Sequence, residues 1–337
     1  GLTLATGRPE IAKQILLAFA PYVSQGMLPN FFPEAGTPPE YNTADAALWY
    51  VETAAAYAEA TRDLATLEAL WPSLQDVVTS YRKGTRYGIH MDADGLIVAS
   101  APGVQLTWMD AKIGDWVVTP RMGKPVEIAA LWYNALSRMG ELAALLKEPA
   151  KELEALAQLA RSGFERFWNE QTGFCYDVLD GSGGDDATLR PNQIFAVALP
   201  HSPLTRERQL AVVDVCAARL LTSNGLRTLA PSDPRFVPHY AGAQRDRDGA
   251  YHQGSVWPWL LGPFAVAHAR VYGDPARARA FLEALADQLL DGGLGTISEI
   301  ADGAAPFTPR GAIAQAWSVA ELLRAWKFLS DGVKRAS

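Results

Sequence analysis

The segment Val126–Leu146, VEIAALWYNALSRMGELAALL, is followed after only Lys147-Glu-Pro149 by a second segment, Ala150–Asn169, AKELEALAQLARSGFERFWN. In both segments apolar residues recur every three or four positions, which is the spacing of an amphipathic helix. A break of this length joins two antiparallel helices that pack against each other. The stretch therefore predicts a helix pair as the unit from which the fold is built.

The same helical periodicity extends over most of the chain. Short breaks join the two helices of a pair, whereas long loops rich in glycine and proline join one pair to the next. The further predicted helices are Pro9–Tyr22, Thr43–Ala60, Asp63–Tyr81, Asn192–Leu199, Leu204–Leu221, Val256–Tyr272, Pro275–Leu290 and Ala312–Leu329. The five long loops cover residues 24–42, 82–125, 170–191, 222–255 and 291–311. Loops of this length are uncommon and usually functional.

An antiparallel stack of helix pairs places every short turn at one end and every long loop at the other. We therefore expect an all-α toroid of helix pairs, an (α/α) barrel, with its long loops gathered on one face. An open solenoid is the alternative, but the chain shows no repeat of fixed period. Within Tyr87–Val98 we expect a short hairpin, with Asp92–Gly95 as its turn.

The composition narrows the classes of function. The 337 residues allow a large core in one or two domains, and the formal net charge of −7 argues against a nucleic-acid surface. The sequence shows neither a run of about 18 apolar residues nor a signal peptide. We interpret Cys175 and Cys216 as free thiols in a reducing cytosol. The five histidines lack metal-binding spacing, so we expect no metal or other cofactor.

Two long loops each carry a carboxylate among aromatic and small residues. Asp110 lies in Gln105-Leu-Thr-Trp-Met-Asp-Ala-Lys112, and Glu299 lies in Gly295-Thr-Ile-Ser-Glu-Ile300. An apolar setting raises a carboxyl pKa, which would suit Asp110 as a general acid. Capping of a helix is the alternative for Asp110. Glu299 fits either a general base or a carboxylate bound to local backbone. Such a carboxylate pair is what hydrolysis of a glycosidic bond requires.

Polar residues at the predicted helix starts are candidate ligands for sugar hydroxyls. Thr43 is expected to cap its helix, which leaves Asn42 and Asp45 on the face where the loops converge. Arg190 and Asn192 flank a proline at another helix start. The candidate substrate-binding residues also include Lys112. Glu127 fits either a partner of the helix dipole or a substrate ligand.

The densest aromatic cluster is Tyr251-His-Gln-Gly-Ser-Val-Trp-Pro-Trp259. Trp257, together with Trp108, is a candidate platform for stacking against a sugar ring. His252 could hydrogen-bond a hydroxyl group or serve as a buried structural histidine. Gln253 completes the set of candidate substrate-binding residues.

Several long motifs, in order along the chain, resemble those of one enzyme family. They are Leu28-Pro-Asn-Phe-Phe-Pro33, Glu40-Tyr-Asn-Thr-Ala-Asp-Ala-Ala-Leu-Trp49, Leu106-Thr-Trp-Met-Asp-Ala-Lys112, Gly123-Lys-Pro-Val-Glu-Ile128, Leu189-Arg-Pro-Asn-Gln193, Tyr251-His-Gln-Gly-Ser-Val-Trp-Pro-Trp259, Gly295-Thr-Ile-Ser-Glu-Ile300 and Gln315-Ala-Trp-Ser318. The chain resembles the C-terminal glucosidase domain of the glycogen debranching enzymes. That resemblance implies an (α/α)6 barrel that releases glucose from α-1,6 branch points with inversion. It implies Asp110 as the general acid and Glu299 as the general base.

The family pattern also includes a Trp-Gly-Arg-Asp motif upstream of the segment that begins here at Gly1. We therefore expect residues 1–337 to form a single glucosidase domain that lacks the first helix or two of its barrel. The parent protein would then carry a further N-terminal domain. A branched α-glucan is the expected partner and the cytoplasm the expected location. The alternatives are a glycan-binding fragment without catalysis and another (α/α)6-barrel sugar enzyme, such as a trehalase.

Overall fold

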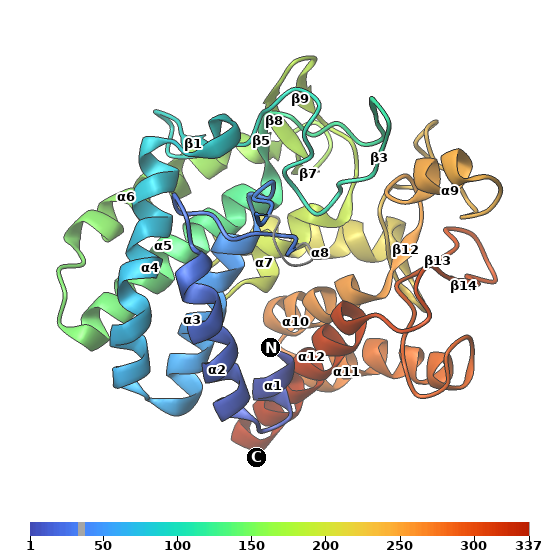
Figure 1. Ribbon diagram of the computed structural model, residues 1–337. Helices are drawn as coiled ribbons and strands as arrows, with labels where there is room; N and C mark the ends of the chain where they lie inside the picture. The colour runs from blue at the N-terminus through green and yellow to red at the C-terminus, as the bar shows by residue number, and fades with distance from the viewer. Residues whose placement is uncertain (33–37, 337) are drawn as a thin grey trace.

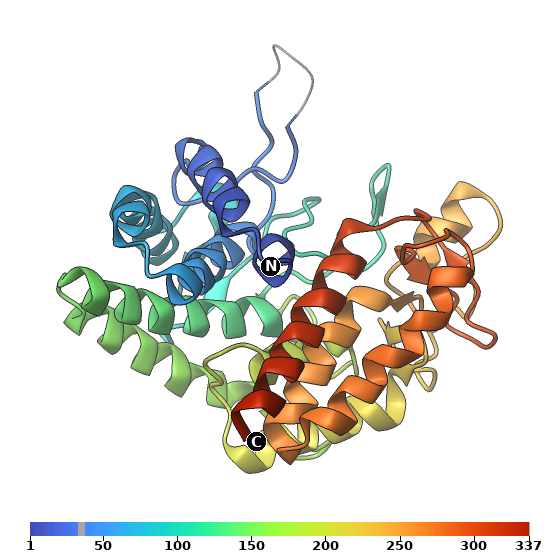
Figure 2. The same ribbon diagram turned by 90° about the horizontal axis from the view of Figure 1, so that it is seen from below.

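The computed structural model describes residues 1–32 and 38–336 (Figures 1 and 2). Pro33, the last residue of one motif quoted above, lies outside these ranges. The α-helices of the described residues are α1 (Leu2–Ala5), α2 (Pro9–Phe19), α3 (Ala46–Thr61), α4 (Leu64–Lys83), α5 (Val126–Leu146), α6 (Lys151–Phe164), α7 (Phe195–Ala198), α8 (Arg206–Arg219), α9 (Gln244–Ala250), α10 (Leu261–Tyr272), α11 (Pro275–Glu283) and α12 (Ala316–Ala336).

The helices form a double-layered ring, as the helix-pair pattern predicts. Along the inner layer α3 packs on α5, α5 on α7, α7 on α10 and α10 on α12. The outer layer consists of α2, α4, α6, α8 and α11, each packed against inner helices. The short helix α1 contacts both α2 and α12, so the first and last parts of the ring lie side by side (Figure 1). The prediction of an all-α toroid is confirmed.

Local sequence explains where some of the helices begin. The Asp63 carboxylate accepts a hydrogen bond from the Thr66 N–H, 3.1 Å away, at the start of α4. The Asp274 carboxylate caps α11 in the same way, just before Pro275. The start of α3 differs from the prediction that Thr43 caps the helix. The helix begins at Ala46, and the residue at the capping position is Asp45. The Thr43 hydroxyl donates to the Asp45 carboxylate instead of capping the helix.

Three predicted helices are shorter than expected because their ends pair as strands, and one of them is Leu204–Leu221, whose last residue lies in a strand. Trp168–Asn169 (β6) pairs with Phe174–Cys175 (β7), and Val256–Trp257 (β12) lies in the middle of a five-stranded sheet. The order in that sheet is β10 (Leu221–Thr222), β11 (Gly225–Arg227), β12, β13 (Ile300–Ala301) and β14 (Pro309–Arg310). Backbone pairing with distant segments therefore overrides the local periodicity at these positions.

The remaining strands lie in the long loops. The predicted hairpin is confirmed, because β1 (His90–Met91) pairs with β2 (Ile97–Val98). A second hairpin joins β3 (Lys112–Ile113) and β4 (Trp116–Val117). A three-stranded sheet joins β5 (Lys124–Pro125), β8 (Val178–Gly181) and β9 (Gly184–Asp186). Figure 1 shows these strands along the upper and right-hand side of the helix ring.

Hydrogen bonds connect the long loops to one another in sequence order. The Arg86 guanidinium donates to the Ser24 hydroxyl over 2.9 Å, which joins the first two loops. Pairing of β5 with β8 joins the second to the third. The Ala230 N–H donates to the Leu189 carbonyl at 3.2 Å, and the Tyr240 N–H donates to Asp302 at 2.9 Å. The five loops therefore form one connected face, as expected from the alternation of short and long connections.

Three properties of the described residues bear on the class of protein. No described helix combines the length and apolar character that crossing a bilayer requires. Within residues 1–32 and 38–336, no group of three or more His, Cys, Asp or Glu side chains is arranged to hold a metal ion. Cys175 and Cys216 are buried free thiols, and burial raises the pKa of Cys175 to about 12.

Candidate active site

Glu299 is held by residues from two different segments of the loop face. The Tyr251 hydroxyl donates a hydrogen bond to its Oε1. The Ala312 N–H donates to its Oε2 at 2.9 Å, and the Gln315 amide reaches Oε1 at 3.5 Å. The side chain is half-buried. One interpretation of Glu299 was a carboxylate bound to nearby backbone, and the Ala312 N–H provides such a bond to Oε2. The other oxygen, Oε1, is bound by the side chain of Tyr251, which comes from a distant loop.

Asp110 lies in the loop that follows the buried Trp108 and precedes β3. It begins no helix, so the alternative of helix capping does not apply. The carboxyl is open to solvent on one side, yet desolvation by the surrounding protein raises its pKa. A carboxyl group with a raised pKa keeps its proton to higher pH, as a general acid must.

Tyr251 connects the two carboxylates electrostatically. Burial, the hydrogen bond to Glu299 and the negative charges of Glu299 and Asp110 together raise the pKa of Tyr251. Glu299 contacts the phenol directly, and the Asp110 charge acts on it through space.

Asn42 and Asp45 lie on the Asp110 side of the site. Burial raises the pKa of Asp45, and the Asp110 charge adds to the increase, while the hydrogen bond from Thr43 opposes it. The Asn42 Oδ1 atom is buried without a hydrogen-bond partner in the described part of the chain. The Lys112 ammonium donates to the Gly103 carbonyl at 2.7 Å. Asn42 and Lys112 line one cavity together with Asp110, whereas Asp45 is linked to Asp110 only through its charge.

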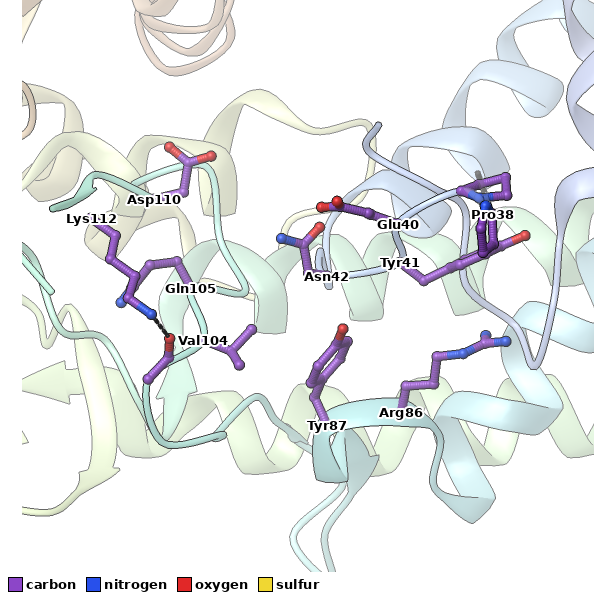
Figure 3. A pocket seen from close by; sticks show the side chains of 12 residues that line it. Pro38, Glu40, Tyr41, Asn42, Arg86, Tyr87, Val104, Gln105, Asp110 and Lys112 are labelled. Carbon is purple, nitrogen blue, oxygen red and sulfur yellow. Dashed lines mark hydrogen bonds between the residues drawn. The ribbon is translucent and has the colours of Figure 1, made fainter. Parts of the chain in front are cut away.

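A cavity of about 610 Å³ begins at Asp110 and runs along the loop face (Figure 3). In Figure 3, Asp110 and Lys112 lie on one side, Tyr41 and Arg86 lie on the other, and Tyr87 stands between them. Asn42 and Gln105 also line the cavity. Glu299 does not. The cavity is within the size range of pockets that bind organic ligands, about 300–1,000 Å³.

Three other predicted ligands are buried and bonded to protein. Arg190 donates to the carbonyls of Thr228 and His252, at 3.0 and 2.8 Å, and to the Gln253 side chain at 2.8 Å. Gln253 in turn donates to the Val118 carbonyl at 3.1 Å. Asn192, fully buried, accepts from the Trp108 indole N–H at 2.9 Å. These contacts fix the loop of Trp108 and the Tyr251 segment in place.

Glu127 forms part of a buried ion-pair cluster. The Arg121 guanidinium donates to both Glu127 oxygens and, through Nε, to Asp177 at 2.6 Å. The two carboxylates raise the pKa of Arg121 despite its burial, so it stays charged. Only 2% of the Glu127 side chain is exposed. Glu127 therefore lies in the first turn of α5 and also has a direct charge partner, Arg121.

The aromatic residues form a packed cluster beneath Asp110. The Trp108 ring lies edge-on against Trp257 and His252, with centroids 5.3 and 5.4 Å apart. His252 stacks on Trp257 at 5.3 Å and is fully buried. Burial and the charges of Arg190 and Arg121 lower the pKa of His252 well below its ordinary value, so the imidazole is neutral. Trp108 and Trp257 are 8% and 3% exposed, which leaves little ring surface for a ligand.

A family model described as amylo-α-1,6-glucosidase matches residues 1–324. The chain belongs to the amylo-α-1,6-glucosidase family. It is thus a member of a glycoside hydrolase family. The glycogen debranching enzyme of Saccharomyces cerevisiae is 28% identical over 359 aligned positions, which cover 78% of this chain and 23% of the yeast protein. The chain therefore spans about a quarter of the length of that relative.

Solved structures with the same fold include a GH63 mannosylglycerate hydrolase from Thermus thermophilus, bound to Tris and D-glycerate. Its TM-score is 0.69 at 16% identity, covering 97% of this chain and 90% of that one. An uncharacterized conserved protein from the same organism has a TM-score of 0.67 at 18% identity, with 93% and 87% covered. At these identities the likeness shows the fold alone, which is that of the (α/α)6-barrel enzymes.

Three residues of this family member's site were not predicted from the sequence. Tyr251 lies inside a quoted motif, but nothing local indicates that its hydroxyl reaches Glu299. Arg121 and Asp177 lie in long loops, away from the predicted helix starts. A signal existed for Arg121, because a buried Glu127 needs a cation and Arg121 is six positions away. Asp177 has no comparable sequence signal.

Proposed function

We propose that this chain is an inverting glycoside hydrolase that releases glucose from α-1,6 branch points of glycogen or limit dextrin. Asp110 would be the general acid and Glu299 the general base. The observation that supports this best is the common effect of both carboxylates on Tyr251. The raised pKa of Asp110, caused by desolvation, suits the acid. The half-buried Glu299, with its oxygens oriented by Tyr251 and Ala312, suits the base.

In this proposal the reaction is a single displacement. Protonated Asp110 gives its proton to the bridging oxygen as the bond from the anomeric carbon to that oxygen breaks. Glu299 takes a proton from a water molecule that attacks the anomeric carbon from the opposite face. The water oxygen becomes the hydroxyl of β-glucose. Inverting enzymes keep their two carboxyl groups about 6.5–9.5 Å apart to leave room for this water.

Direct contact with sugar hydroxyls is assigned to Asn42 and Lys112, which line the cavity with Asp110, and to Asp45, on which the Asp110 charge acts. Arg190, Asn192, Gln253 and Glu127 are assigned to holding the loops, because their polar groups bond to protein. Trp108, His252 and Trp257 would form the apolar floor that desolvates Asp110. The proposal includes a branched α-glucan as partner and a cytoplasmic location, with which two unpaired buried cysteines are compatible.

The test is the anomer that wild-type protein first releases from a branched limit dextrin, followed by NMR. β-Glucose from the α-linked substrate supports the proposal, whereas α-glucose contradicts it. The variants Asp110→Asn and Glu299→Gln should each abolish most glucose release. Normal release by either variant overturns the residue assignment. Binding of a maltooligosaccharide without any release would favour a glycan-binding module, and release of glucose from trehalose alone would favour a trehalase.

A further inference from the structure

The cavity of about 610 Å³ contains the proposed acid but not the proposed base. A general acid acts on the bridging oxygen, and that oxygen stays with the leaving group. The leaving group must therefore lie on the acid's side of the broken bond, away from the base and its water. The cavity extends from Asp110 past Gln105 and Tyr87 toward Tyr41, and Glu299 is not among the residues that line it (Figure 3).

We propose that this cavity binds the α-1,4-glucan chain that remains after the branch glucose is removed, with Tyr87 as its stacking platform. The proposal rests on the assignment of Asp110 as the general acid. It adds a leaving-group site to the glucose site, and the residues that line it, apart from Asp110, take no part in the chemical step. This site would determine preference for a polymeric over a small substrate.

Tyr87 carries the first structural argument. Its backbone is left-handed, with φ 57° and ψ 23°. Bulky side chains rarely adopt this backbone conformation, and residues held in it cluster at functional sites. The Tyr87 side chain is 39% exposed and lines the cavity. An aromatic ring presented to solvent in this way offers a face to the apolar face of a sugar ring.

The wall opposite Asp110 is rigid. The Tyr41 hydroxyl donates to the Tyr22 carbonyl at 3.0 Å, and the Arg86 guanidinium lies over the Tyr41 ring at 4.4 Å. Arg86 is itself held by the Ser24 hydroxyl at 2.9 Å. The cavity wall is thus preformed, so binding a glucan there would need little ordering of protein.

Polar groups that a glucan could satisfy line the same cavity. The Asn42 Oδ1 atom has no partner in the described residues. Glu40 and Gln105 add a carboxylate and an amide to the lining. A mixture of aromatic faces with a few hydrogen-bonding groups fits a carbohydrate, whose rings have apolar faces and hydroxyl edges.

The experiment compares two substrates in wild-type protein and in Tyr87→Gly. Glycine accepts the left-handed backbone without strain, so this variant removes the ring without a cost in folding. Tyr87→Asn, which also tolerates that conformation, serves as a second variant. The control is Tyr272→Ala, an exposed tyrosine at the end of α10 that bonds to Asp214 away from the cavity.

We expect Tyr87→Gly and Tyr87→Asn to raise KM for branched limit dextrin about tenfold, a loss equivalent to one aromatic contact. Hydrolysis of α-glucosyl fluoride should be unchanged, because its leaving group is a single fluoride ion. Tyr272→Ala should match wild type with both substrates. An unchanged KM for dextrin, or equal losses with both substrates, would overturn the proposal.

A binding measurement separates this proposal from the proposed function. Calorimetric titration with linear maltoheptaose needs no turnover. Wild-type protein should bind it, and Tyr87→Gly should bind about tenfold more weakly. If wild type hydrolyses neither substrate but the variant still loses maltoheptaose binding, the hydrolase assignment fails while the glucan site stands. If both proteins bind equally, the site is rejected whatever the activity.

Discussion

The Tyr251 hydroxyl donates a hydrogen bond to Glu299 Oε1, across 48 positions of sequence. The Ala312 N–H holds the other oxygen of the same carboxylate at 2.9 Å. Glu299 is therefore oriented by two segments at once, and its side chain is fixed before any substrate binds. A general base needs such orientation because its lone pair must point at the attacking water.

Tyr251→Phe should lower kcat about 10- to 100-fold, because a hydrogen bond to a charged group contributes about 1.5–3 kcal/mol. The variant keeps the ring packed against His252 and Trp257, at 4.7 and 4.9 Å, and loses only the donor. Without that donor Glu299 keeps only its contacts with Ala312 and Gln315, so the loss should appear in kcat, with KM for dextrin nearly unchanged. Steady-state kinetics with limit dextrin provide the measurement, and an unchanged kcat would mean that Tyr251 acts only through packing.

Asp110→Asn should lower kcat with limit dextrin about 10²- to 10⁴-fold and spare α-glucosyl fluoride, whose leaving group needs no proton. Desolvation raises the pKa of Asp110, so wild type should lose dextrin activity as the pH rises through that raised pKa. The fluoride reaction of Asp110→Asn should lack this basic limb. Equal loss with both substrates would contradict the role of acid. Stopped assays over a pH series provide the measurement.

Asp45→Asn should stabilise the protein near neutral pH. Burial raises the pKa of Asp45, so the folded state holds this proton more tightly than the unfolded chain does. That contribution to stability is fully present below about pH 4, the unfolded pKa, and is lost as pH rises through the folded pKa. The variant should therefore unfold at a higher temperature than wild type near neutral pH, with a smaller difference below about pH 4. Asp115→Asn, in the exposed β3–β4 turn, is the control.

Arg121→Met should lower the free energy of unfolding by about 3–5 kcal/mol, because it leaves two buried carboxylates without their cation. Glu127 and Asp177 are each only 2% exposed. Arg82→Met breaks an exposed pair with Glu152 and should change stability little. Urea unfolding of both variants gives the comparison. Similar midpoints for the two would show that the buried cluster is not needed for folding.

The sequence predicted best where structure depends on neighbouring residues. The expected helix Val126–Leu146 coincides with α5, because its apolar stripe and the left-handed Lys147 that ends it are local features. The strand Val256–Trp257 could not be separated from the following helix, since its partners β11 and β13 are distant in the chain. At the start of α3 the capping position was predicted for Thr43 and is occupied by Asp45. The sequence could not separate the two, because both residue types occur at this position.

The candidate site was predictable as residue types and not as a set of contacts. The motifs around Asp110 and Glu299 led to the proposal of these two carboxylates as acid and base. They could not indicate that Arg190 and Asn192 turn inward to bond with protein, because that depends on the loops of Asp177 and Thr228 folding beside them. The cavity wall formed by Tyr41 and Tyr87 depends on the left-handed backbone at Tyr87, which no pattern of a tyrosine predicts.

The hydrogen bonds that run from loop to loop across the face make it one mechanical unit on a ring of helices. A single loop exchanged with that of a relative would leave donors and acceptors of its neighbours unmatched. New substrate preferences on this scaffold should therefore arise by coordinated replacement of several loops, with the ring beneath them unchanged.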